Sequence, residues 1–139
     1  MSYQQTINEI RTVAQVVNPT GRFDHGRIID VSQAFAGDYP VIWLYPFNTL
    51  MPTADEILDD NTLLLGFWFQ DSPSSSNAER EEIIARAYDL AKQFFTQVQL
   101  SKVVRINGRI QLEPQYQMYS GTVSGYAARF TYQNYEPCE

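Results

Sequence analysis

The chain has 139 residues and a net charge of −6, from 10 Lys and Arg against 16 Asp and Glu, and its length predicts a single domain, 1–139. Hydrophobic residues make up 44% of it, enough to bury a core, which excludes a disordered chain. No apolar run reaches the roughly 18–20 residues of a membrane span, and the N-terminus lacks a signal-peptide pattern. One cysteine cannot form an internal disulfide, which indicates a reducing compartment.

The first part of the chain predicts an amphipathic helix and then an irregular segment. Apolar residues recur at three- and four-residue spacing over residues 3–17, with Gln and Asn on the other face. The run Asn18-Pro19-Thr20-Gly21 should end this helix. Residues 21–38 show no clear period, and Phe23 and the Ile28-Ile29 pair are their expected buried anchors.

Two apolar runs predict strands that are covered on both faces. Residues 40–47 (PVIWLYPF) and 63–69 (LLLGFWF) are apolar at both parities, which is typical of such strands. Pro46 should end the regular pairing of the first strand because proline has no N–H to donate. The stretch from Asn48 to Asn61 is too long for a tight hairpin and predicts an excursion at one end of the sheet.

The second half predicts a long helix and three strands. Ser76 or Asn77 can cap a helix that runs to about residue 99 with one broad apolar stripe. Residues 102–106 and 109–113 flank Asn107-Gly108, a dipeptide typical of a type I′ hairpin turn.

The last predicted strand, residues 122–133, alternates cleanly, with Tyr126 and Phe130 on one face and Arg129 on the other. Together the segments predict an α+β fold. We expect a single mixed, largely antiparallel sheet, packed by a long central helix and a short N-terminal helix, in the order α-β-β-α-β-β-β.

Residues able to do chemistry form no recognisable constellation. His25, the only histidine, follows Asp24, but no serine stands in a GxSxG elbow. Cys138 lies beside the C-terminus, and the chain has too few soft ligands for a zinc site. No GxGxxG or GxxxxGK[ST] motif occurs. We therefore expect no catalytic residue, no metal and no cofactor, and leave a glycosidic carboxylate pair as an open alternative.

The distribution of charge argues against tight or sequence-specific nucleic-acid binding. Residues 1–60 carry three basic and eight acidic residues, and no basic stripe is present to neutralise phosphates. The densest acidic run lacks the ligand spacing and turn glycine of a calcium loop, so a solvated face is the simplest interpretation. Its members are Asp55, Glu56, Asp59 and Asp60.

The layout resembles that of the small neck and tail-completion proteins of tailed bacteriophages, particularly tail terminators. The phrases that carry the resemblance are FDHGRIIDVSQAFAGDYPVIWLYP, the helix segment DLAKQFF, and SGTVSGYAARFTYQNYEPC near the end. The resemblance covers most of the chain as an order of elements.

This resemblance implies a non-enzymatic virion protein, assembled in the host cytoplasm, that joins the tail tube to the head. It implies a homo-oligomeric ring, hexameric or dodecameric, that contacts other tail or neck proteins and through which DNA passes. In such a ring the acidic residues Asp55, Glu56, Asp59 and Asp60 would line the channel and repel DNA phosphates.

Exposed apolar residues and one polar strand face are the candidate interface. Exposed apolar groups often mark a protein partner, although these residues can equally tuck back onto the core. The candidates are Leu50, Met51, Ile57 and Leu58 in the excursion, and Arg129 and Gln133 in the last strand.

The alternative function is a small bacterial ligand-binding or regulatory module. It would be favoured by a pocket between the sheet and the long helix, lined by Trp43, Trp68, Phe94 and Tyr126.

Overall fold

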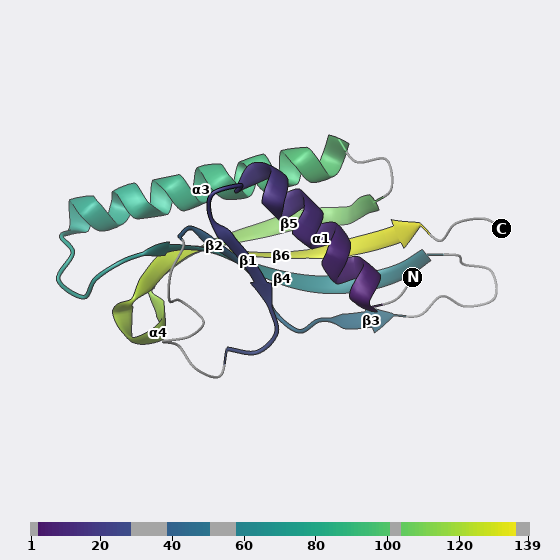
Figure 1. Cartoon of the computed structure of the whole chain (residues 1–139), viewed down its shortest axis with the longest axis horizontal. Coiled ribbons are helices and arrows are strands. Elements are labelled where there is room, and N and C mark those ends of the chain that lie inside the picture. Colours follow the sequence, from purple (N-terminus) through teal and green to yellow (C-terminus); the bar gives the residue numbers. More distant parts are fainter. Residues whose placement is uncertain (1–2, 29–38, 51–57, 101–103, 136–139) are drawn as a thin grey trace.

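The computed structural model describes residues 3–28, 39–50, 58–100 and 104–135, with only the backbone for 49, 50, 58–60, 104, 105, 107, 120 and 133–135. These residues form a mixed six-stranded sheet with two long helices, α1 and α3, packed on one face (Figure 1). This architecture confirms the α+β fold predicted from the sequence. The elements are α1 (Tyr3–Val17), β1 (Arg22–His25), β2 (Val41–Leu44), β3 (Asn48–Leu50), β4 (Leu58–Gln70), α3 (Asn77–Leu100), β5 (Val104–Gln117), α4 (Met118–Gly121) and β6 (Val123–Tyr135).

The sheet is ordered β1-β2-β4-β6-β5, and only the β1–β2 pair is parallel. Strands β2 and β3 follow one another along the same edge of β4, with Val41 opposite Trp68 and Asn48 opposite Thr62. Pro46 lies in the gap between them, which confirms that it ends the pairing of β2. The expected excursion is therefore paired at both of its ends, and residues 51–57 lie outside the described residues.

The sequence of β1 carries no clear strand signal, because contacts with Pro40, far along the chain, set the position of the strand. The amide of Asn18 and the backbone N–H of Arg22 both donate to the carbonyl of Pro40, at 2.8 and 3.1 Å. Gly21 is essential to this approach, since a Cβ there would lie 2.2 Å from the same carbonyl oxygen. These contacts hold β1 beside β2. Phe23 packs against the main core and Ile28 against the opposite face, so both are partly buried anchors as expected, and Ile29 lies outside the described residues.

The predicted hairpin at Asn107-Gly108 is wrong. The described residues of both expected arms, 104–106 and 109–113, belong to the single strand β5, which pairs with β6 on either side of an irregularity between Asn107 and Gln111. Gly108 has φ +83, so the positive-φ residue serves a bulge and not a turn. Pairing with the long strand β6 supplies more hydrogen bonds than a local hairpin would, and this pairing cannot be read from the dipeptide.

The main core lies between the sheet and the two helices. Phe94, fully buried on α3, meets the ring of Phe67 on β4 at 5.6 Å between centroids. The apolar stripe of α3 is buried as predicted, and so are Ala128, Phe130 and Tyr132 on one face of β6, whereas Tyr126 on the same face is only partly buried. These predictions held because periodic burial is a local property of the sequence.

A second, smaller apolar cluster lies on the opposite face of the sheet. It consists of Val41, Trp43, Trp68 and Val123, with partly buried neighbours that include Tyr45 and Tyr119. Strands β2 and β4 are thus covered on both faces where they pair, as expected. Trp43 and Trp68 do not line a pocket together with Phe94, as the alternative function would require, because the tryptophans lie on the face of the sheet opposite to Phe94.

Candidate functional site

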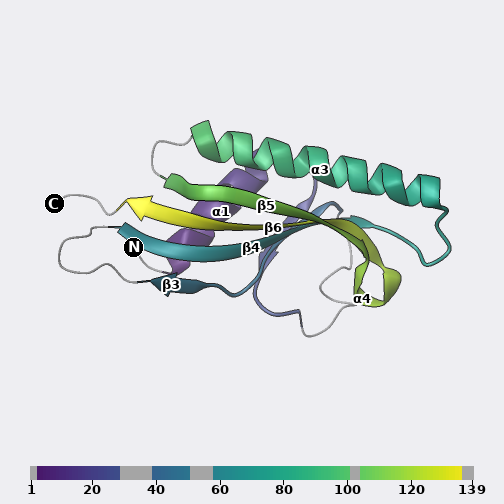
Figure 2. The same cartoon turned by 180° about the vertical axis from the view of Figure 1, so that it is seen from behind.

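One face of the sheet is open over its β4–β6–β5 half. Both long helices pack on the other face, and Figure 2 shows these three strands in front of α1. The side chains of Thr62, Gln111, Glu113 and Arg129 are exposed, and no helix among the described residues covers them. We call this surface the open face. A polar, solvent-exposed face is ordinary for an antiparallel sheet, so a local feature on it is needed to indicate a binding site.

The open face contains a hollow with a cavity volume of about 350 Å³. Ala127 on β6 lines the hollow, and its small side chain leaves the space above it open. Gly66, opposite Ala127 on β4, makes room for the indole of Trp68, since a Cβ on that glycine would be 2.1 Å from Trp68 Nε1. A larger residue at either position would fill the hollow or expel the indole.

The apolar wall of the hollow comes from the β5–β6 connection. Tyr119 in α4 has φ +54, a backbone conformation that bulky residues rarely adopt and that only surrounding contacts can enforce. Its ring meets the edge of Trp68 at 5.8 Å between centroids, and its hydroxyl shares a hydrogen bond with that of Tyr45. Burial, together with this hydrogen bond, raises the pKa of Tyr45 above its usual value.

The opposite wall carries two charges and several amides. Arg129 on β6 and Glu113 on β5 both line the hollow and are exposed. Arg129 stands opposite Gln111 and Glu113 opposite Ala127, so the two charged residues are diagonal neighbours on adjacent strands. Neither forms an ion pair within the described part of the chain. The hollow therefore has an apolar end and a polar end with one group of each sign.

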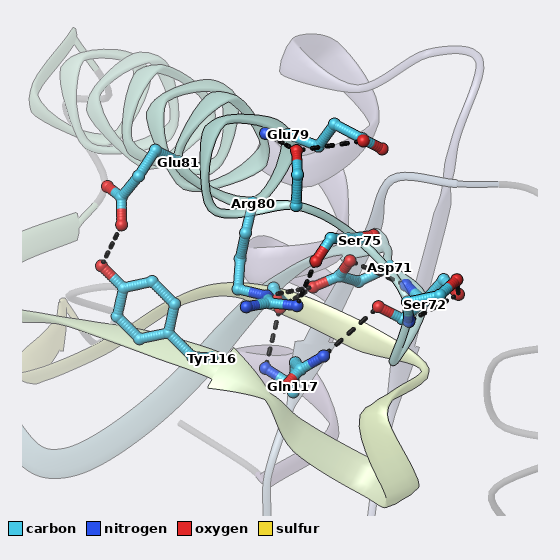
Figure 3. Close-up of polar contacts among 11 residues, drawn as sticks. Asp71, Ser72, Ser75, Glu79, Arg80, Glu81, Tyr116 and Gln117 are labelled. Atoms are coloured by element: carbon cyan, nitrogen blue, oxygen red, sulfur yellow. Dashed lines mark hydrogen bonds and ion pairs between the residues drawn. The ribbon is translucent and has the colours of Figure 1, made fainter.

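A buried polar cluster joins the end of β4 to the start of α3 and to β6 (Figure 3). The carboxylate of Asp71 accepts hydrogen bonds from Ser124 Oγ and from the backbone N–H of Ser72, and Arg80 Nε lies 3.5 Å from it. Burial by itself would raise the pKa of Asp71. The hydrogen bonds from Ser124 and Ser72, a further hydrogen bond from Ser75 and the positive charge of Arg80 together outweigh this effect, so the pKa lies below its usual value.

This Asp71 cluster is a structural anchor. Ser124 Oγ donates to Asp71 and accepts from the backbone N–H of Gln117. Both hydrogen bonds hold the hydroxyl in place within the fold, so Ser124 is not positioned as a nucleophile. Arg80 donates to the carbonyl of Ser75 at 2.9 Å, which ties the helix start to the preceding loop. The cluster fixes the end of the sheet from which the walls of the hollow arise.

The candidate interface residues lie in different parts of the sheet. Arg129 is exposed on the open face and lines the hollow. Leu50 and Leu58 lie in the paired strands β3 and β4, and Gln133 in β6 stands opposite Asp60. Met51 and Ile57 lie outside the described residues.

The acidic run is only partly a loop, which corrects the sequence-based expectation. Asp59 and Asp60 belong to β4 and pair with Asn134 and Gln133 of β6. Pairing with β6 extends β4 well before its apolar part, and the local sequence LDDN carries no strand signal. Asp55 and Glu56 lie outside the described residues.

The hydrogen bond between Asp24 and His25 is made by the His25 backbone and not by its imidazole. The Asp24 carboxylate accepts the backbone N–H of His25 at 2.9 Å, and neighbouring residues of a strand point to opposite faces. Cys138 lies outside the described residues.

The polar wall of the hollow was missed by the sequence analysis. Residues 111–117 (QLEPQYQ) place Gln111, Glu113 and Gln115 at alternating positions, which is the signal of a strand with one wet face. The expected hairpin ended the second strand at residue 113 and so hid this pattern.

Within the described ranges, no group of three or more His, Cys, Asp or Glu residues is placed to hold a metal ion. No helix in the same part of the chain is long and apolar enough to cross a membrane. The sequence matches no protein-family model, and no curated protein matches it.

Proposed function

We propose that the protein is a non-enzymatic virion structural protein of a tailed bacteriophage, a subunit of a tail-terminator or neck ring that joins the tail tube to the head. The observation that carries the proposal is the edge of the sheet at β3, which pairs with β4 and with no other strand among the described residues. An unpaired strand edge presents N–H and C=O groups that can pair with another chain. The phage-like order of elements supports the same function.

The contact between copies is assigned to the hairpin end of the sheet, meaning β3 and the β4 residues paired with it, Asp60–Thr62. This end contains Leu50 and adjoins Leu58, two of the apolar candidates for an interface. It also contains Asp60, so the same end would place acidic groups along a ring lumen, where negative charge lets DNA slide. The proposed partners are copies of this chain, hexameric or dodecameric, and other tail or neck proteins.

The test is native mass spectrometry over a concentration series, with negative-stain images of the same full-length sample. A closed ring of six or twelve copies with a central hole supports the proposal. Thr62→Arg, exposed on the hairpin end, should block ring closure. The matched control is Gln93→Arg, exposed on α3, which should leave the ring intact. A monomer or dimer throughout the series, or equal effects of the two variants, would contradict the proposal.

A bacterial ligand-binding module is the second candidate, and the hollow in the open face favours it. Its volume falls within the roughly 300–1,000 Å³ of small-molecule sites, and its lining mixes aromatic rings with a few polar groups. Saturable binding of a small molecule by a strict monomer would favour this function over the ring.

A further inference from the structure

The hollow has a built-in chemical polarity that points to one class of ligand. At one end stand Tyr119 and Met118, an aromatic ring and a flexible thioether, both partly buried. At the other end stand Arg129 and Glu113, a cation and an anion on adjacent strands. An occupant complementary to both ends has an apolar group on one side and both charges on the other.

We propose that the hollow binds a free amino acid with a large apolar side chain. The carboxylate would accept two parallel hydrogen bonds from the Arg129 guanidinium, a geometry that arginine favours. The ammonium group would donate to Glu113, and the side chain would pack against Tyr119 and Met118. The hydroxyl bond between Tyr45 and Tyr119 holds the aromatic wall in place before binding, so little ordering is required on that side.

The size of the hollow agrees with this class. A volume of about 350 Å³ is near the small end of ligand sites, which excludes a folded partner inside it and fits one small molecule. The exposed charges indicate modest affinity, because ion pairs in contact with water contribute little individually. The inference does not depend on the ring, since the hollow lies toward α4 and the proposed ring contact lies at the hairpin end.

The first experiment is isothermal titration of the full-length protein with L-phenylalanine, L-leucine and L-methionine. At least one should bind with a Kd below about 1 mM, a threshold that corresponds to a weak but specific complex. Phenethylamine, which lacks the carboxylate, and 3-phenylpropionate, which lacks the ammonium group, should bind at least tenfold more weakly than L-phenylalanine. Failure of all three amino acids, or equal affinity for the analogues, overturns the proposal.

Substitutions in the hollow test which residue contacts which group of the ligand. Arg129→Gln should remove the preference for L-phenylalanine over phenethylamine, because phenethylamine lacks only the carboxylate that Arg129 would bind. Glu113→Gln should remove the preference for L-phenylalanine over 3-phenylpropionate, which lacks the ammonium group. Both positions are exposed, so both variants should fold. Ala127→Trp should fill the floor and abolish binding, whereas Thr62→Trp, on the same face outside the hollow, should not. Binding that survives Ala127→Trp in a folded protein, or is lost equally in Thr62→Trp, overturns the proposal, and ring formation is scored separately on the same samples.

Discussion

Replacing Asp71 with Asn should destabilise the protein and remove part of its sensitivity to acid. The Asp71 side chain is fully buried and accepts from Ser124 Oγ and from the backbone N–H of Ser72, the latter at 2.7 Å. The asparagine amide keeps the shape but replaces one acceptor oxygen with a donor. It therefore leaves Arg80, whose side chain is only 16% exposed, without its carboxylate.

The expected loss at pH 7 is about 2–4 kcal/mol, the usual cost of leaving a largely buried charge and a hydroxyl without their partner. For a domain of this size that loss corresponds to a fall in Tm of about 6–16 °C. Because the pKa of Asp71 is lower in the folded protein than its ordinary value of 3.8, the unfolded chain binds more protons in acid. The stabilisation is therefore complete above about pH 5 and is lost as the pH falls through the folded-state pKa.

Urea unfolding followed by tryptophan fluorescence measures both effects, since Trp43 and Trp68 are buried. The gap between wild type and Asp71→Asn should be widest near neutral pH and should narrow as the pH falls below the ordinary aspartate pKa. Asp89→Asn, an exposed carboxylate on α3, is the matched control and should lie within about 0.5 kcal/mol of wild type. Equal stability of Asp71→Asn and wild type at pH 7, or a gap independent of pH, would refute the reasoning.

Three further predictions concern the helices. Burial raises the pKa of Glu9 above 4.5 despite the hydrogen bond from Tyr132, so stability should fall as the pH rises from 4.5 through that raised pKa. Glu9→Gln should flatten this pH dependence of the free energy of unfolding, measured in urea, and should be no less stable than wild type at pH 7. A clear loss of stability at pH 7 would contradict this prediction. Ser76 caps α3, accepting the backbone N–H of Glu79 at 3.2 Å, so Ser76→Ala should cost about 1 kcal/mol by thermal unfolding, and Ser76→Thr much less. Phe94→Ala should lower the free energy of unfolding by about 3–5 kcal/mol in the same measurement, because it leaves a cavity at the centre of the main core. A loss below about 1 kcal/mol would contradict this prediction and show that the surrounding side chains fill the cavity.

The sequence by itself determined the elements whose signals are local. The stripe of α3, the alternation of β6 and the break at Pro46 each depend on residues within a few positions of one another. Periodic burial follows from the geometry of a single helix or strand, so one segment carries the whole signal.

Only the tertiary structure decided how the segments meet. Asn107-Gly108 has the signature of a turn, yet pairing with β6 keeps β5 continuous through it. Ser124 reaches Asp71 across 53 positions of sequence, and the hollow is lined by residues of β4, β5, α4 and β6 together. These contacts depend on register between distant strands. A slip of one residue would turn a strand's apolar set to the wrong face, but a slip of two residues keeps every side chain on its face, so the alternation of one strand does not by itself fix its register.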